Sequence, residues 1–371
     1  MMKINNIYSE IISKENLYHS AYMASRGRRY RDSTANFNFF LEEEIGRLHK
    51  ELLTKTYRHG KYRLFKIYDP KERSIAAAPF KDRVVHHAVH DVIEPIIDKT
   101  FIYDSYACRK DKGTHKAVDR AQGFLRANKF CFHGDIKQYF PSINHRIVKR
   151  ILRIRIEDQD ALWLLDEIID SAVSLPGCLQ VGKEAADSDN RIGLPIGNLT
   201  SQFFANLYLN ELDYFIKFDL RIRYYLRYMD DFLIFSNEKI MLIEVKERIS
   251  KFLNVSLELR LHKDKSQIYS RSDGIKFLGF RLFSEYRRLA SDNVRRFKKQ
   301  LNRFDCLFAN GKITKSAVSD SLRCWVAHSK YANAATLRRN IFKGLVKKKK
   351  QYRLSGAKFI NQLTAGVDDE V

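Results

Sequence analysis

Cysteine is scarce in this chain of 371 residues, and its five cysteines are scattered, odd in number and never spaced as C-x-x-C. This pattern indicates neither a disulfide framework nor a zinc site. Long apolar runs are also lacking, because no stretch approaches the roughly 20 apolar residues that span a membrane. No signal-peptide pattern, lipidation motif or internal repeat is found. We therefore expect a soluble, cytosolic protein without membrane contact.

Acidic residues are in deficit: 44 Asp and Glu stand against 67 Lys and Arg, which gives a formal net charge of +23. The basic residues are spread along the chain, so the folded body itself is expected to carry a positive surface. A phosphate backbone is the natural partner of such a surface, and its binding weakens steeply as salt rises. The four lysines at 347–350 are more typical of a solvated tail than of a specific contact.

Two of the acids stand side by side, Asp230 and Asp231, between apolar, β-prone segments at 224–229 and 232–235. This pattern predicts a tight hairpin with the acids at its turn. Adjacent carboxylates repel each other, so a fold tends to hold them together where a cation lies between them. The alternative is an acidic turn on a solvated hairpin, since Asp is a common turn residue.

A third acid, Asp135, ends a short apolar strand predicted at 130–135. After it, Tyr139 and Phe140 predict a turn packed on the core, and Pro141 is expected to stop the strand. If this strand lies beside the hairpin, three carboxylates meet at one edge of a sheet. Hard oxygen ligands of this kind suit Mg²⁺. Two such ions can activate an attacking hydroxyl and stabilise a leaving pyrophosphate, which is the chemistry of polymerases.

Helical and strand patterns are mixed along the chain, which predicts an α+β fold. We expect an amphipathic helix at 40–53, a hairpin at 62–75 with its turn at 69–72, and a helix at about 81–97. Residues 178–192 are polar, acidic and glycine-containing, and they are expected to form an exposed loop.

Four motifs occur in an order typical of one family: Asp135, GLPIGNLTSQ at 193–202, YMDD at 228–231 and GIKFLGF at 274–280. This order resembles that of reverse transcriptases, whose signature is the Tyr-X-Asp-Asp hairpin. The fourth motif resembles their primer-gripping hairpin. The resemblance is close over about residues 60–285 and looser beyond them.

The resemblance implies a right-hand polymerase architecture, with an antiparallel palm sheet backed by helices. The implied divisions are an N-terminal helical extension (1–60), fingers (61–127), a palm (128–285) with a finger insertion at about 145–190, a helical thumb (286–345) and a basic, polar tail (346–371).

Three segments narrow the resemblance: LPIGNLTSQ at 194–202, FKDRVVHHA at 80–88 and SYACRKDKGTH at 105–115. They are similar to segments of the reverse transcriptases of diversity-generating retroelements. Those enzymes copy a template RNA with errors concentrated at adenines, and the cDNA then rewrites a variable gene. They act with a small basic helical accessory protein. The resemblance thus implies an error-prone RNA-directed DNA polymerase of a bacterium or phage, with template RNA, RNA/DNA hybrid and dNTPs as partners.

The resemblance assigns Asp135, Asp230 and Asp231 to catalysis and to the binding of two Mg²⁺ ions. It adds the main-chain carbonyl of Ile136 as a further metal ligand. Within this set, Asp231 is expected to contribute more to the geometry of the site than to direct ligation.

The residues expected at the incoming nucleotide are Lys71, Arg73, Phe140, Ile196, Gly197, Gln202 and Lys265. Phe140 falls five residues after Asp135, where the family carries an aromatic gate against the ribose 2′-OH; the alternative is an ordinary core position. Lys71 and Arg73 are expected to reach the triphosphate from the 62–75 hairpin, or to form only its solvated tip. Lys265 lies where the family places a general acid near the pyrophosphate, with ordinary surface charge as the alternative.

Ile196 is a departure from accurate retroviral and intron enzymes, which carry Gln at this place. Isoleucine offers neither a donor nor an acceptor to the nucleotide, so discrimination is expected to fall. Gly197 would allow close approach of the main chain to the nucleotide. Gln202 is expected to brace the template base at the start of a helix over 203–218. Further contacts to template or primer are expected from Arg109, Lys110, Lys112, Tyr228, Met229, Phe277 and Gly279.

Two other functions remain open at this point. One is a related bacterial anti-phage defence reverse transcriptase that uses the same palm for another purpose. The other is a catalytically silent RNA-binding scaffold, which the three converging acids disfavour because a silent protein has no reason to keep charges that repel.

Overall fold

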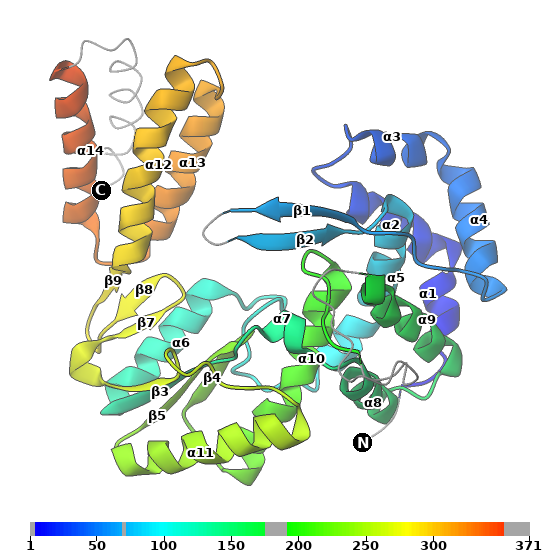
Figure 1. The fold of residues 1–371 in the computed structure, drawn as a ribbon, viewed down its shortest axis with the longest axis horizontal. Helices are drawn as coiled ribbons and strands as arrows, with labels where there is room; N and C mark the ends of the chain where they lie inside the picture. Colours follow the sequence, from blue (N-terminus) through cyan, green and yellow to red (C-terminus); the bar gives the residue numbers. More distant parts are fainter. Residues whose placement is uncertain (1–3, 69–71, 175–190, 352–371) are drawn as a thin grey trace. The chain divides into compact units, whose positions relative to one another are not determined.

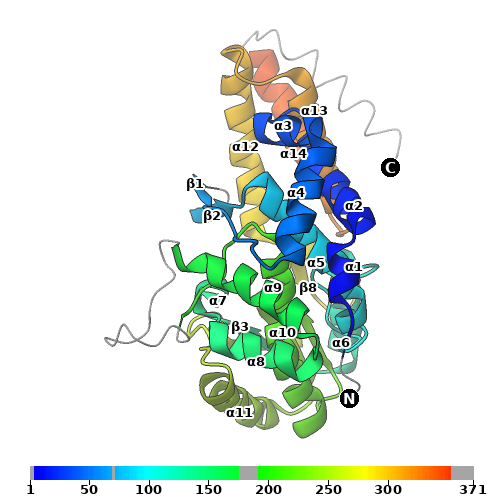
Figure 2. The same cartoon turned by 90° about the vertical axis from the view of Figure 1, so that its right-hand side faces the viewer.

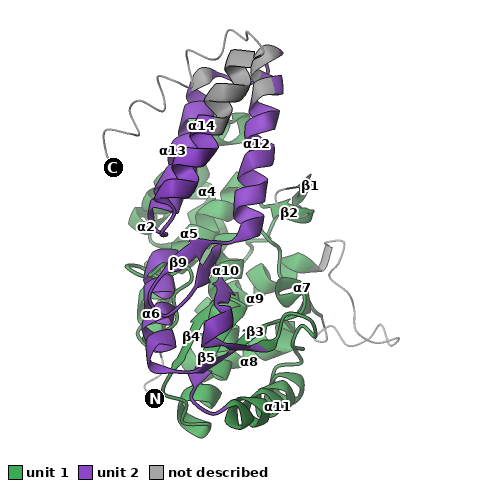
Figure 3. Cartoon of the chain, turned by 90° about the vertical axis from the view of Figure 1, so that its left-hand side faces the viewer, with its two compact units in different colours: residues 1–113, 132–234, 239–267 green, residues 114–131, 235–238, 268–371 purple. Residues whose placement is uncertain are grey.

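The computed structural model describes residues 4–68, 72–174 and 191–351 (Figure 1). Lys71, residues 178–190 of the expected exposed loop and the tail beyond residue 351 lie outside the described residues. The chain forms two compact units (Figure 3). Unit 1 takes residues 1–113, 132–234 and 239–267, and unit 2 takes residues 114–131, 235–238 and 268–371.

Unit 1 begins with helices. They are α1 (Tyr8–Ile12), α2 (Lys14–Ser25), α3 (Asp32–Phe39), α4 (Leu41–Leu53) and α5 (Phe80–Asp98). Helix α2 packs against α4 and α5 (Figure 2). The amphipathic helix predicted at 40–53 is confirmed as α4, whose Ile45, Leu48 and Leu52 are fully buried. Burial of each such side chain stabilises the fold by roughly 1.5–3 kcal/mol.

The predicted hairpin at 62–75 is confirmed as β1 (Arg63–Ile67) and β2 (Arg73–Ala77). The two strands are antiparallel, and Ile67 lies opposite Arg73 at the tip. The helix predicted at 81–97 is confirmed as α5.

The central sheet has the strand order β4-β5-β3-β6. Its strands are β3 (Phe130–Asp135), β4 (Tyr225–Tyr228), β5 (Asp231–Ser236) and β6 (Gln267–Ser270). The helices of unit 1 that follow β3 are α7 (Tyr139–Ser142), α8 (His145–Arg155), α9 (Gln159–Asp170), α10 (Leu199–Tyr214), which continues as a π-helix over Phe215–Asp219, and α11 (Lys239–Ser256).

Two expected boundaries differ from the structure. The strand at β3 ends at Asp135, and Pro141 lies inside the short helix α7, so the proline does not stop the strand. Helix α10 begins at Leu199, whereas Ser201 and Gln202 were expected to open a helix over 203–218. Its first turn therefore includes Ser201 and Gln202.

One carboxylate joins the start of the chain to α9. Asp158 caps α9 by accepting hydrogen bonds from the main-chain amides of Asp160 and Ala161, both at 3.1 Å. Its other oxygen accepts from the amides of Ile7 and Tyr8, at 2.8 and 2.9 Å. A single side chain thus satisfies free amides at the beginning of two helices.

Unit 2 contains α6 (Thr114–Ala127), a three-stranded antiparallel sheet and three long helices. The sheet has the order β7-β8-β9, from Ile275–Phe277, Phe280–Leu282 and Arg287–Leu289. The helices are α12 (Ser291–Ala309), α13 (Lys315–Lys330) and α14 (Ala335–Gln351). The ring of Trp325 on α13 stacks on Phe297 of α12, with 3.7 Å between centroids.

Helices and antiparallel sheets occur together, so the predicted α+β polymerase fold class is confirmed. Within the described residues, no helix is long and apolar enough to cross a membrane.

Candidate active site

Three carboxylates of unit 1 lie at the ends of neighbouring strands. Asp135 is the last residue of β3 and Asp231 is the first residue of β5, the next strand in the sheet. Asp230 lies in the turn between β4 and β5, where Tyr228 pairs with Asp231. The expectation that the strand of Asp135 lies beside the hairpin of the paired acids is confirmed.

Gly134 permits the close approach of β3 and β5. A Cβ atom at this residue would overlap the ring of Phe232, the residue after Asp231. The Phe232 ring lies edge-on to Phe132 at 5.9 Å between centroids. Gly134 was not predicted as a site residue, although a glycine inside a strand often marks such an approach.

The electrostatics of the site favour a cation near Asp230. Burial and, to a smaller extent, the neighbouring charges of Asp135 and Asp231 raise the pKa of the Asp230 carboxyl to about 6, against the opposing effects of a main-chain hydrogen bond and of Lys265. An added positive charge would relieve this repulsion and restore ionisation of Asp230.

The other two acids each face a basic side chain. The Nζ atom of Lys265 donates to both carboxylate oxygens of Asp135, at 2.7 and 2.9 Å. The Nε2 atom of His133 is hydrogen-bonded to Asp231. Burial lowers the pKa of His133, but the charge of Asp231 and this hydrogen bond outweigh burial and raise it. His133 was also missed from the sequence, since its partner is distant in the chain.

The main chain of Asp135 is held by the segment that carries Lys265. The Ser266 Oγ atom accepts from the amide of Asp135 and donates to its carbonyl, each at 3.2 Å. The amide of His262 donates to the same carbonyl at 2.8 Å. Ile136, the expected carbonyl ligand, is buried and forms an antiparallel bridge with Leu261.

Among the described residues, no group of three or more His, Cys, Asp or Glu side chains is arranged to hold a metal ion. The donor chemistry of Asp135, Asp230 and Asp231 nevertheless fits Mg²⁺, which prefers carboxylate oxygen. The raised pKa of Asp230 is a second observation that fits a cation. Binding of Mg²⁺ by Asp135 would require Lys265 to release this carboxylate.

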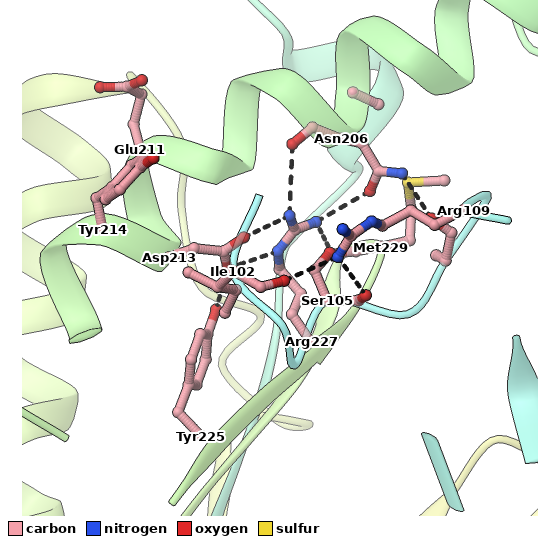
Figure 4. A network of polar contacts seen from close by, with 12 residues as sticks. Ile102, Ser105, Arg109, Asn206, Glu211, Asp213, Tyr214, Tyr225, Arg227 and Met229 are labelled. Atoms are coloured by element: carbon pink, nitrogen blue, oxygen red, sulfur yellow. Dashed lines mark hydrogen bonds and ion pairs between the residues drawn. The ribbon is translucent and has the colours of Figure 1, made fainter. Parts of the chain in front are cut away.

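Arg227, directly before the Tyr-Met-Asp-Asp turn, is fully buried and forms a two-pronged ion pair with Asp213 of α10 (Figure 4). Its Nε and Nη2 atoms donate to the two carboxylate oxygens at 2.7 and 2.6 Å. The Tyr225 hydroxyl donates to the same carboxylate at 2.6 Å. The Nη1 atom of Arg227 donates to the main-chain carbonyl of Met229 at 3.1 Å. The guanidinium thus links α10 to the turn.

The main chain of Arg227 is also fixed. Its amide donates to the carbonyl of Asp104 and its carbonyl accepts from the amide of Tyr106, both at 2.9 Å. Asn206 of α10 accepts from Arg227 through its side chain at 3.2 Å and donates to the carbonyl of Ala107 at 2.7 Å. Strand β4, α10 and the segment 104–107 therefore meet at Arg227.

Residues expected at the nucleotide lie in several parts of unit 1. Arg73 is exposed at the first position of β2. Phe140 is half-buried in α7, and its carbonyl accepts from the amide of Leu194 at 2.9 Å. Gln202 is exposed on α10, and its side-chain oxygen accepts from the Cys108 thiol at 3.4 Å.

Ile196 and Gly197 contact the hairpin of β1 and β2. The carbonyl of Ile196 accepts from the amide of Ala76 at 3.0 Å. Gly197 has a φ of +122°, and a Cβ there would lie 2.9 Å from Cγ2 of Ile75. A glycine is thus needed here because its φ angle is positive and because the side chain of Ile75 on β2 leaves no room for a Cβ atom. This reason differs from the expected one, which was close approach of the main chain to a nucleotide.

The basic residues at 109–112 differ in their surroundings. The guanidinium of Arg109 is nearly buried, with 8% of its side chain exposed, and pairs with Asp98. It also donates to the carbonyls of Ile102 and Ser105. Contact with a template would require these bonds to break. Lys110, in contrast, is exposed.

The Nζ atom of Lys112 donates to the carbonyl of Tyr103 and lies 3.5 Å from the centre of its ring. The ring of Tyr103 is 72% exposed, so this pair lies at the protein surface.

The two expected primer contacts, Phe277 and Gly279, belong to unit 2. The Phe277 ring is buried, with 1% exposed, so it packs the β7-β8-β9 sheet from within. Gly279 has a φ of +89° between β7 and β8, and its carbonyl accepts from the amide of Ala290 at 2.9 Å. Both residues shape the hairpin rather than present a side chain at its surface.

An acid-bearing strand beside a hairpin with acids in its turn, set in an α+β fold, defines the class of nucleic-acid polymerases that carry their acids on a palm sheet. Within this class, the chain belongs to the reverse transcriptase (RNA-dependent DNA polymerase) family, whose profile it matches over residues 67–282. This finding confirms the family expected from the motifs.

Similar proteins occur in bacteria and eukaryotes. Protein YkfC of Escherichia coli K12 is 28% identical over 299 residues, which cover 68% of this chain and 75% of YkfC. The group II intron-encoded protein LtrA of Lactococcus lactis is 22% identical over 334 residues, covering 72% of this chain and 54% of LtrA. Nuclear intron maturase 3, mitochondrial, of Arabidopsis thaliana is 23% identical over 329 residues, which cover 80% of this chain and 42% of the maturase. The chain thus spans about half or less of these two intron-related proteins.

Proposed function

We propose that the protein copies an RNA template into DNA, with Asp135, Asp230 and Asp231 as its metal-binding catalytic carboxylates. The observation that carries this proposal is the position of the three acids at the end of β3, in the turn between β4 and β5 and at the start of β5, together with the raised pKa of Asp230. Two Mg²⁺ ions, when bound, would activate the primer hydroxyl and stabilise the leaving pyrophosphate. Lys265, whose ammonium contacts Asp135, is the proposed proton donor to the pyrophosphate after the ammonium has released the carboxylate.

Deoxynucleotide choice is assigned to Phe140, and fidelity is assigned to Ile196. Phe140 is the proposed gate against the ribose 2′-OH, and its half-buried ring supports a fixed position. Ile196 supplies no polar group beside the nucleotide, which supports error-prone synthesis. Arg73, exposed on β2, is the proposed contact to the triphosphate.

The retroelement type is part of the same proposal: the enzyme makes cDNA with errors at template adenines, and this cDNA diversifies a variable gene. It would act in the cytoplasm of a bacterium with a small basic helical accessory protein. The main alternative is an anti-phage defence enzyme, and the names of two relatives, an intron-encoded protein and an intron maturase, add a function linked to an intron as another use of the same chemistry. The template error pattern separates the retroelement enzyme from both.

The test is primer extension by the purified protein on an RNA template with all four bases, followed by sequencing of the cDNA. Errors concentrated opposite adenines, abolished by Asp230→Ala, are expected. Accurate cDNA would support the proposed polymerase activity and overturn the assignment to the retroelement type. Synthesis that survives chelation of Mg²⁺ or the Asp230→Ala change would overturn the assignment of the acids.

A further inference from the structure

An ion pair without a catalytic assignment lies beside the acidic turn. Arg227 and Asp213 are both fully buried, and two hydrogen bonds join them. Removing two charges from water is costly, and an apolar pair of similar volume often stabilises a fold equally well. Stability alone is therefore a weak reason for this pair.

The contact of Arg227 with Met229 suggests another reason. Met229 has a φ of +56°, in the left-handed region that non-glycine residues seldom adopt. Its carbonyl accepts from Nη1 of Arg227 at 3.1 Å. This bond holds the peptide group that leads directly into Asp230, so the orientation of the first turn carboxylate depends on it.

We propose that Arg227 is a positioning residue: held by Asp213, it fixes the Met229 carbonyl and so sets where Asp230 and Asp231 lie relative to α10. This inference rests on the proposed catalytic role of the acids. It assigns Asp213 a role too, because its two oxygens fix the rotation of the guanidinium.

Lysine could not replace Arg227 in this arrangement. The planar guanidinium donates in three directions at once, to Asp213, Asn206 and Met229. A lysine ammonium keeps the charge but lacks the rigid fork. The Arg227→Lys variant therefore separates the geometry of the contact from its charge.

A second buried arginine on the neighbouring helix α8 provides a matched control. Arg155 has 6% of its side chain exposed and donates to Glu211, also on α10, at 2.8 Å. It makes no contact with the turn among the bonds of the described residues. Arg155→Lys should lower the unfolding temperature too, by less than Arg227→Lys does, because Glu211 is 33% exposed whereas Asp213 is fully buried.

The first measurement compares steady-state DNA synthesis by these variants. Arg227→Lys is expected to lower kcat by about tenfold to a hundredfold, as a misplacement of reacting groups does. The KM for dNTP should change less than about twofold, since no nucleotide contact is removed. Equal kcat values for Arg227→Lys and Arg155→Lys would overturn the proposal.

A second variant removes the pair without leaving a buried charge. It combines Arg227→Met, Asp213→Leu and Tyr225→Phe, because the Tyr225 hydroxyl would otherwise lose its acceptor. This variant is expected to fold with an unfolding temperature near that of the parent and still to lose kcat. Full kcat in the folded triple variant would show that the pair serves stability alone.

Hydrogen exchange keeps the inference testable if the parent makes no DNA. In the triple variant, amides of residues 228–231 should exchange faster than in the parent, while those of α9 should not. Unchanged exchange at 228–231 would overturn the positioning role. A parent that makes no DNA on its own but shows the expected exchange would support the positioning role of Arg227, and it would point to a missing accessory protein before it pointed against the proposed function.

Discussion

At the residue scale, the charge of Asp230 sets a balance between stability and function. Burial raises its pKa to about 6, well above the value of about 3.9 in an unfolded chain. A carboxyl whose pKa is higher in the folded than in the unfolded protein stabilises the fold at pH values below its pKa in the unfolded chain. This stabilisation is lost as the pH rises through its pKa in the folded protein. Near pH 7 and without metal, ionisation of the buried Asp230 carboxyl therefore lowers the free energy of unfolding.

Asp230→Asn is expected to stabilise the metal-free protein at pH 7.5 by about 1–2 kcal/mol, because the buried charge is removed. At pH 4, where the wild-type carboxyl is protonated, the gain should vanish. Thermal unfolding in chelator at the two pH values measures this difference. The exposed Asp264 supplies a control in Asp264→Asn. A gain that is the same at both pH values would contradict the assignment to ionisation.

The side chain of Ile196 can be changed without loss of its main-chain contact. Its carbonyl, not its side chain, accepts from Ala76, so Ile196→Gln should fold normally. Glutamine restores a donor and an acceptor, and misincorporation opposite adenine should fall by about tenfold, which corresponds to about 1.4 kcal/mol of added discrimination. Sequencing of cDNA from parent and variant measures the rates, with Ile196→Leu as the apolar control. An unchanged error spectrum would dismiss this explanation of low fidelity.

The placement of single residues was predictable where it followed from a local motif. The paired acids and Asp135 stand out because their spacing has few structural explanations. Arg227 does not stand out, since its partner Asp213 lies on α10 and any Asp on a helix resembles a surface residue in the sequence. Arg109 is the opposite case: its sequence context indicates an exposed cation, yet Asp98 holds it inside.

At the scale of elements, the packing of β3 on β5 depends on Gly134. A Cβ at this residue would overlap the Phe232 ring, so Gly134→Ala must push apart the strands that carry Asp135 and Asp231. We expect a loss of stability of about 1–3 kcal/mol, as for overpacking in a core. DNA synthesis should fall by at least about tenfold, as for misplaced catalytic groups.

Chemical denaturation and primer extension measure the two effects of Gly134→Ala. Pairing it with Phe232→Leu makes room for the methyl group and should recover part of both losses. If the losses of stability from Gly134→Ala and Phe232→Leu simply add in this double variant, overlap with the Phe232 ring is not the cause of the effect of Gly134→Ala.

The cap by Asp158 joins two elements that are distant in sequence. Burial raises the pKa of this carboxyl, but four main-chain amides outweigh burial and hold it below its usual value. Its stabilisation is therefore present at neutral pH and lost as pH falls below the unfolded value of about 3.9. Asp158→Ala is expected to destabilise the protein by about 1–3 kcal/mol at pH 7, since caps of two helices are lost.

Urea unfolding at pH 7 and pH 3 tests the cap. Asp158→Asn, which keeps an acceptor oxygen, should lose less than Asp158→Ala at pH 7. Equal losses for Asn and Ala would argue against hydrogen bonding as the source.

Most elements followed from hydrophobic periodicity, as α4 and the hairpins show. The start of α10 was placed too late, at Ser201 and Gln202, although Asn198 directly before Leu199 is a residue type typical of helix starts. Strand β9 falls at residues 287–289, where the thumb helices were expected to begin. Its short length leaves too few residues to show an alternating pattern.

At the scale of the whole molecule, the net charge of +23 governs contact with nucleic acid. If 6–10 phosphates are contacted, affinity for RNA should fall by roughly 10³–10⁵ between 50 and 200 mM salt. Fluorescence anisotropy with a labelled RNA of fixed length measures the slope. Lys110→Ala, at an exposed position, should reduce the slope by about one unit if it contacts a phosphate. A slope near zero would contradict electrostatic binding.

The contacts of Asp158 also bear on how the protein is made. Ile4 exchanges main-chain hydrogen bonds with Arg155 and Glu157, and the amides of Ile7 and Tyr8 end on Asp158. These partners are translated about 150 residues later. Helix α1 also packs on α2, α4 and α5, but the amides of Ile7 and Tyr8 at its start gain their acceptor only after Asp158 has been made, so α1 is completed late. A nascent chain stalled before residue 158 should still expose α1 to proteases, and one stalled well after it should not.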